Sequence, residues 1–111
     1  MPKAIMLVFT EAVSPEREDD YNRWYDDHHT ADVLRVPGLL ASTRFIASAV
    51  QIGKPHLPSR YCAIYELDSA ELSSVPANLR KANAEGGMVV TDSMSIGAVY
   101  IYEQLTERTE A

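Results

Sequence analysis

Two adjacent histidines and a nearby carboxylate are the residues of this 111-residue chain best suited to chemistry. His28 and His29 carry imidazoles, which titrate near neutral pH and can act as general acids or bases. Asp32 follows His28 by four residues and His29 by three, so on a helix its carboxylate could orient either ring. We therefore expect His28, His29 and Asp32 to be the catalytic residues, and the spacing leaves open which histidine acts.

Aromatic side chains share the helical face that carries these groups. At about 100° per residue, Tyr21, Trp24 and Tyr25 fall on the same arc as both histidines, and the opposite face is polar. His28 lies nearer the centre of the arc, which favours its burial, whereas His29 lies nearer the rim. An aromatic stripe is first of all a core feature, but beside imidazoles it can also line a ligand pocket.

Two strand residues complete the predicted site. Arg44 could hold a carboxylate or an enolate, or could equally pair with an acidic side chain. The phenol of Tyr65 could donate a hydrogen bond to a developing oxyanion, or could simply pack the sheet. The predicted substrate-binding residues are thus Tyr21, Trp24, Tyr25, Arg44 and Tyr65.

The sequence predicts neither a metal site nor a cofactor. Adjacent histidines point about 100° apart on a helix and do not easily share one tetrahedral ion. Phosphate-loop, nucleophile-elbow and dinucleotide motifs are absent from the sequence. A single histidine leaves haem ligation open. Pro2, after Met1, resembles the start of tautomerases with an N-terminal proline base, a weaker alternative because that chemistry needs a free amine.

Six elements must position these residues. Apolar runs predict strands over 4–9, 39–48, 60–67 and 96–102, and capping and periodicity predict a helix over 14–35. A capping box at Asp68 predicts a second helix that ends near Ala84, with a break or a fresh start at Ser74 because of Pro76. The order βαββαβ predicts an α+β, ferredoxin-like fold: a four-stranded antiparallel sheet with two helices on one face. We expect residues 1–111 to form a single domain.

The strands predict a partner as well as a fold. They are apolar on both faces, yet two helices can cover only one face of a four-stranded sheet. The same face of a second copy is the simplest cover for the other, so we expect a homodimer through the helix-free face.

Composition limits the classes of partner that the chain could bind. The formal net charge is −6 and Lys and Arg are not clustered, which argues against nucleic-acid and membrane partners. Cys62 is the only cysteine, so an internal disulfide is excluded. The sequence shows neither a signal peptide nor a run of membrane-spanning length, which predicts a cytoplasmic protein.

One stretch of the chain carries a family resemblance. The segment Tyr21-Asn-Arg-Trp-Tyr-Asp-Asp-His-His29 is followed by Val33-Leu-Arg-Val-Pro-Gly38 and by a strand that ends Thr43-Arg-Phe45. This pattern resembles the dimeric α/β-barrel superfamily, specifically its EthD-like branch. The resemblance implies a pocket between sheet and helices in each subunit, with a histidine near the helix end pointing into it.

The resemblance implies small-molecule chemistry without choosing the reaction. The superfamily includes cofactor-free lyases, isomerases and polyketide cyclases, quinone-forming monooxygenases and haem enzymes. We predict a cofactor-independent lyase, isomerase or cyclase acting on an aromatic, polyketide-like or catabolic carbonyl compound. The alternatives are a quinone-forming monooxygenase and a non-catalytic ligand-binding accessory protein.

Overall fold

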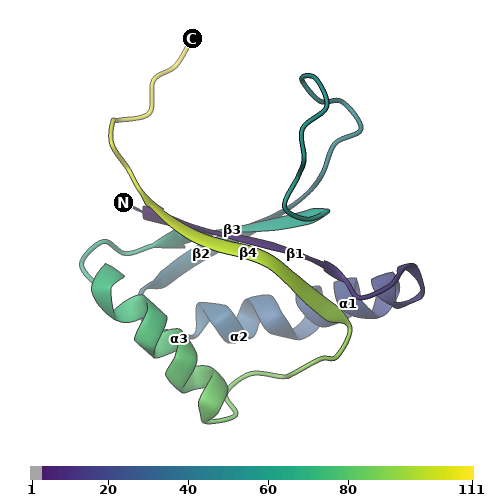
Figure 1. Ribbon diagram of the computed structural model, residues 1–111. Coiled ribbons are helices and arrows are strands. Elements are labelled where there is room, and N and C mark those ends of the chain that lie inside the picture. Colours follow the sequence, from purple (N-terminus) through teal and green to yellow (C-terminus); the bar gives the residue numbers. More distant parts are fainter. Residues whose placement is uncertain (1–3) are drawn as a thin grey trace.

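A computed structural model describes residues 4–111 as one sheet with helices on one side (Figure 1). The strands are β1 (Ala4–Ala12), β2 (Leu39–Ile46), β3 (Tyr61–Leu67) and β4 (Met94–Glu103), antiparallel in the order β2-β3-β1-β4. The helices are α1 (Glu18–Trp24), α2 (Thr30–Leu34) and α3 (Val75–Ala84). The predicted ferredoxin-like α+β fold is confirmed. No helix within residues 4–111 has the length and apolar character to cross a membrane.

The first helical segment is continuous but not uniform. Between α1 and α2 lies one π-helical turn, Tyr25–His29, and the N–H of Thr30 donates to the carbonyl of Tyr25, five residues back. A π turn holds one residue more than an α turn, so every later side chain is rotated by about 100° from its α-helical position. The sequence predicted a plain α-helix here, and the wider turn decides which histidine faces the sheet.

The core lies between the helices and the sheet. Along β3, the side chains of Tyr61, Ala63, Tyr65 and Leu67 are buried, and those between them are partly exposed on the opposite face. This alternation is the period of two that a strand imposes. The fully buried rings of Tyr21 and Tyr65, one from α1 and one from β3, show that the two layers meet through aromatic side chains.

A bulge changes the predicted face of β4. Phe9 pairs with Ala98 and Thr10 with Ile96, so Gly97 is left without a partner on β1. The prediction put Ile96 on the same face as Ala98. That was wrong, because the extra residue of a bulge reverses the alternation beyond it. Ile96 therefore faces the helix side of the sheet together with Val99.

The chain between α3 and β4 is the one long segment on the helix side without regular structure. The helix begins after Ser74, as predicted from Pro76, and ends before Gly86, whose φ is +72°. Residues 87–93, which we call the strap, then return under the sheet to β4 (Figure 1).

The helix-free face of the sheet is apolar and open. Phe45, Tyr100 and Tyr102 are at least half exposed on it, next to the partly exposed Phe9 and Ile64. The loop of residues 47–60 and the tail after Glu103 both extend on this side of the sheet (Figure 1).

Replacing Gly38 with Ala tests the junction between α2 and β2. Gly38 has a φ of +96°, and a Cβ there would lie 2.7 Å from Val75 Cγ2. The left-handed backbone and the clash together should lower the free energy of unfolding by about 2–4 kcal/mol, measured by urea denaturation.

Gly53→Ala is the matched control. Gly53 has a φ of +72° with open space around it, so the variant should lose only about 1–2 kcal/mol. Equal losses in the two variants would show that the contact with Val75 does not matter.

Candidate functional site

A cavity of about 350 Å³ lies between the helices, the sheet and the strap. Its apolar wall includes Met6, Val8, Val33, Leu79, Met88 and Met94, and its polar groups come from Thr10, His29, Tyr65, Asn83 and Thr91. Of the predicted site residues, His29, Trp24 and Tyr65 line this cavity. No Asp, Glu, Lys or Arg of the described chain lines it.

His29 lies against aromatic rings at the cavity wall. Its ring stacks on Trp24, with centroids 4.4 Å apart and an interplanar angle of 23°, and meets Tyr25 edge-on at 4.9 Å. Trp24 and His29 are five residues apart, and the π turn brings side chains at this spacing to the same side of the helix. Burial lowers the pKa of His29, and nearby Asp32 opposes this only in part. The imidazole is therefore neutral at neutral pH.

The two nitrogens of His29 differ in their surroundings. Nδ1 is enclosed and has no hydrogen-bond partner within residues 4–111, so a molecule in the cavity cannot reach this nitrogen. A bound molecule would thus meet the ring through Nε2.

His28 lies on the outer side of the helical segment, away from the cavity that His29 lines. Its side chain is exposed, although the helical periodicity favoured His28 for burial and put His29 at the rim. That expectation was wrong, because the π turn rotates the segment so that His29 takes the inward position.

Asp32 is buried, and its hydrogen bonds go to groups other than the histidines. Its Oδ2 accepts the N–H of Val89 at 2.8 Å, and its Oδ1 is paired with the guanidinium of Arg35. These two contacts, the Val89 N–H first, lower the pKa of Asp32. No hydrogen bond links Asp32 to His28 or His29 within the described chain. The geometry therefore gives Asp32 a role in holding the strap, instead of the predicted role in orienting an imidazole.

Trp24 holds the same peptide of the strap. Its Nε1–H donates to the carbonyl of Val89 at 2.8 Å. Both backbone polar groups of Val89 are thus bonded to side chains of the first helical segment, which satisfies them away from regular structure.

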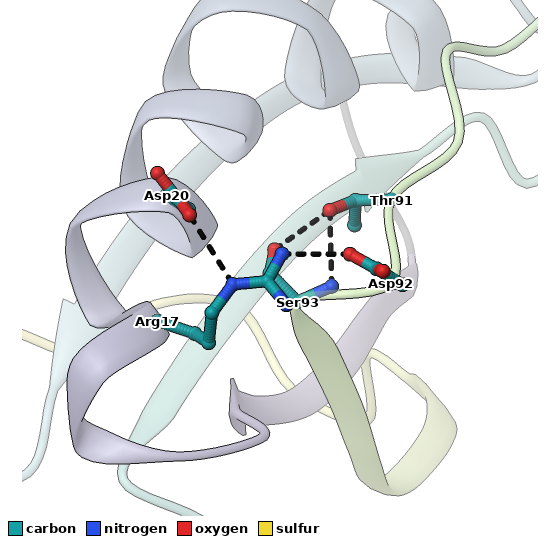
Figure 2. A network of polar contacts seen from close by, with 5 residues as sticks. All are labelled: Arg17, Asp20, Thr91, Asp92 and Ser93. Carbon is teal, nitrogen blue, oxygen red and sulfur yellow. Dashed lines mark hydrogen bonds and ion pairs between the residues drawn. The ribbon is translucent and has the colours of Figure 1, made fainter.

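A second anchor holds the far end of the strap (Figure 2). The guanidinium of Arg17 donates to Asp92 at 2.7 Å and to Asp20 at 3.2 Å. The hydroxyls of Thr91 and Ser93 lie 2.7 Å apart. Arg17 is partly exposed and Asp92 is exposed, so water screens this pair more than it screens the buried contact of Asp32.

Arg44 lies behind the cavity wall. Its guanidinium lies 4.2 Å from the centroid of the Tyr25 ring and donates to Asp26 at 2.7 Å and to Asn22 at 2.8 Å. These contacts fasten β2 to the first helical segment. Arg44 does not line the cavity, so the predicted role in binding a substrate anion is not what this geometry offers.

Three of the buried tyrosines, Tyr21, Tyr25 and Tyr65, bond to groups within the core. The hydroxyls of Tyr25 and Tyr65 lie 3.3 Å apart, and that of Tyr21 lies 2.5 Å from Thr10 Oγ1. Burial raises the pKa of all three phenols, so they stay protonated. Tyr65 lines the cavity, whereas Tyr21 and Tyr25 support its wall.

Several lining residues were missed by reasoning from the sequence. Thr10, a polar residue within an apolar strand, was a usable signal. Thr91 and Met94 carried none, because they lie in the stretch 88–95, which was expected to be a loop, and a segment without periodicity does not reveal what it covers. Asn83 lies on the predicted second helix and was not considered. Pro2 lies outside the described residues. Within residues 4–111, the structure contains no group of three or more His, Cys, Asp and Glu side chains that could hold a metal.

Comparison with known proteins supports the fold. No protein-family model matches the chain, and no curated protein matches it. The structure is similar to that of HapK from Hahella chejuensis, at 17% identity over 97% of this chain and 98% of that one, with a TM-score of 0.58. A putative monooxygenase from Shewanella loihica PV-4 matches at 14% identity over 96% and 98% of the two chains, with a TM-score of 0.53.

Replacing Asp32 with Ala tests its role at the strap. The change leaves the Val89 N–H without an acceptor, so we expect a loss of about 1–3 kcal/mol in unfolding free energy. Hydrogen exchange at the Val89 amide and the Trp24 indole should accelerate. Arg17→Ala, which removes the exposed anchor, should cost at most about 1 kcal/mol. If exchange at Val89 is unchanged in the Asp32 variant, this carboxylate does not hold the strap.

Proposed function

We propose that this chain is a small-molecule enzyme that uses cofactor-independent acid/base chemistry in the cavity beside His29. Its reaction would be that of a lyase, isomerase or cyclase, and its substrate an aromatic, polyketide-like or catabolic carbonyl compound. The observation that supports the proposal is an imidazole in an apolar cavity with an enclosed, unpaired nitrogen. Such a nitrogen costs on the order of 1–3 kcal/mol. Titratable groups in a cleft whose pKa is shifted by burial, as the pKa of His29 is, are concentrated at functional sites.

The proposed chemistry uses the two titratable groups of the cavity. His29 is neutral and meets a bound molecule through Nε2, which can exchange a proton with a substrate or polarise its carbonyl oxygen. The protonated phenol of Tyr65 is a hydrogen-bond donor for negative charge that develops on oxygen. The exposed His28 takes no part in this scheme.

The EthD-like branch and the homodimer belong to the same proposal. The branch is supported by the motif from Tyr21 to His29, and the dimer by the apolar helix-free face. Four strands about 4.8 Å apart and about 26 Å long present about 500 Å². A stable interface buries about 800 Å² on each partner, so the loop 47–60 and the tail after Glu103 would supply the rest.

A quinone-forming monooxygenase is the second candidate, because an apolar cavity free of charged side chains also suits a reactive phenol. Oxygen consumption with a phenolic substrate would favour it, and turnover without oxygen would exclude it. A ligand that is recovered unchanged after long incubation would instead indicate a non-catalytic accessory protein.

Separate replacement of the two histidines tests the catalytic proposal. A panel of carbonyl compounds is incubated with the protein, and turnover is followed by mass spectrometry. His29→Gln should lower the rate at least tenfold, because general acid/base groups typically contribute about 10²–10⁴-fold. His28→Gln is the matched control and should keep full activity. Full activity in the His29 variant would remove the proton-transfer role.

Tyr100→Glu tests the dimer. The wild-type protein should sediment as a particle of twice the 12.3 kDa chain mass, and a charge on the helix-free face should convert it to monomers. Tyr100 is half exposed, so the folded monomer should tolerate the change. Val13→Glu, equally exposed at the turn that leads into the helices, should leave the dimer intact. A monomeric wild-type protein at micromolar concentration would contradict the proposal.

A further inference from the structure

The described residues that line the cavity offer no counter-ion to a bound molecule. The carboxylate of Asp32 is turned to the Val89 N–H and to Arg35, and Arg44 is shielded by the Tyr25 ring and paired with Asp26. A charged ligand would therefore lose its hydration without gaining an ion pair, which is costly in an apolar site. An uncharged ligand avoids this penalty.

The wall of the cavity is suited to flat, conjugated molecules. The Trp24 indole and the His29 imidazole form a stacked pair at the wall. Three methionines, Met6, Met88 and Met94, add polarizable thioethers, which make favourable contacts with aromatic rings. Aromatic faces and edges also favour ring partners over saturated chains of equal area.

The unpaired nitrogen of His29 determines which hydrogen-bonding group the ring presents. A neutral imidazole carries one N–H and one bare nitrogen. A proton on Nδ1 would be a buried N–H without an acceptor, and such donors are rarer in folded proteins than unpaired acceptors. The proton therefore resides on Nε2, and His29 presents a hydrogen-bond donor to the bound molecule.

We propose that the cavity binds an uncharged, conjugated carbonyl compound whose oxygen accepts a hydrogen bond from the Nε2–H of His29. The inference rests on the proposed function for the location of the ligand, and it adds the ligand's charge, shape and polar contact. It concerns binding, so it can be tested with compounds that do not react.

Three naphthalene probes of nearly equal size separate the effect of the hydrogen bond from the effect of ligand charge. Acetonaphthone carries an uncharged acceptor, ethylnaphthalene carries none, and naphthoate carries a negative charge. Isothermal titration calorimetry should show that acetonaphthone binds at least tenfold more tightly than naphthoate and about fivefold more tightly than ethylnaphthalene. The indole N–H of Trp24, the only tryptophan, gives one NMR signal that should shift when the cavity is occupied.

Two variants of His29 test the hydrogen bond itself. In His29→Leu the preference for the ketone over the hydrocarbon should disappear, while both probes still bind. His29→Gln, whose amide N–H₂ can reach the position of Nε2, should restore most of the preference. His28→Gln should bind all three probes as the wild type does. Melting curves and the Trp24 signal confirm that each variant is folded, and the probe preferences of the wild type test the proposal without any variant.

The ring proton is directly observable. In ¹⁵N NMR spectra recorded at neutral pH, the His29 nitrogens should show a protonated Nε2 and a bare Nδ1; the reverse assignment would overturn the proposal.

Equal binding of naphthoate and acetonaphthone, or no binding of any probe, would also overturn the proposal. Loss of turnover in His29→Gln together with such results would leave the proposed function standing. The expected probe preferences without turnover of any carbonyl compound would leave only the binding inference.

Discussion

The wide turn between Tyr25 and His29 sets which side chains the first helical segment turns toward the sheet. Because one extra residue fits into this turn, His29 comes to lie over Trp24, and Asp32 reaches the strap. In an uninterrupted α-helix the inward position would belong to His28. The composition of the cavity therefore depends on a backbone irregularity of a single residue, of a kind often found at functional sites.

The cavity exists because the helices do not cover the whole sheet. The strap covers part of the remaining area, and the side chains of Ile96 and Val99 on β4 stay largely exposed at its edge. Close packing elsewhere is supplied by buried aromatic rings, among them Tyr21, Tyr25 and Tyr65, whose hydroxyls lie against one another or against Thr10. Arg44 completes this arrangement from behind, where it fastens β2 to the helical segment and does not reach the cavity, whose lining within residues 4–111 carries no Asp, Glu, Lys or Arg.

Most of the fold could be predicted from the sequence, because strand burial and helix ends leave local patterns. The apolar runs, Pro76 and the pair Gly86-Gly87 each marked an element that the structure contains. Positions after an irregularity could not be predicted, since the π turn and the bulge at Gly97 change a period that the pattern assumes to be constant. This is why His28 was expected to be the buried histidine and Ile96 was assigned to the wrong face, while His29, Trp24 and Tyr65 were placed at the cavity.

The indole of Trp24 has two tasks that are physically linked. Its face stacks on His29 at the cavity wall, and its N–H is bonded to the carbonyl of Val89. The two contacts belong to one rigid ring, so any tilt of the indole changes the cavity wall and the attachment of the strap at the same time.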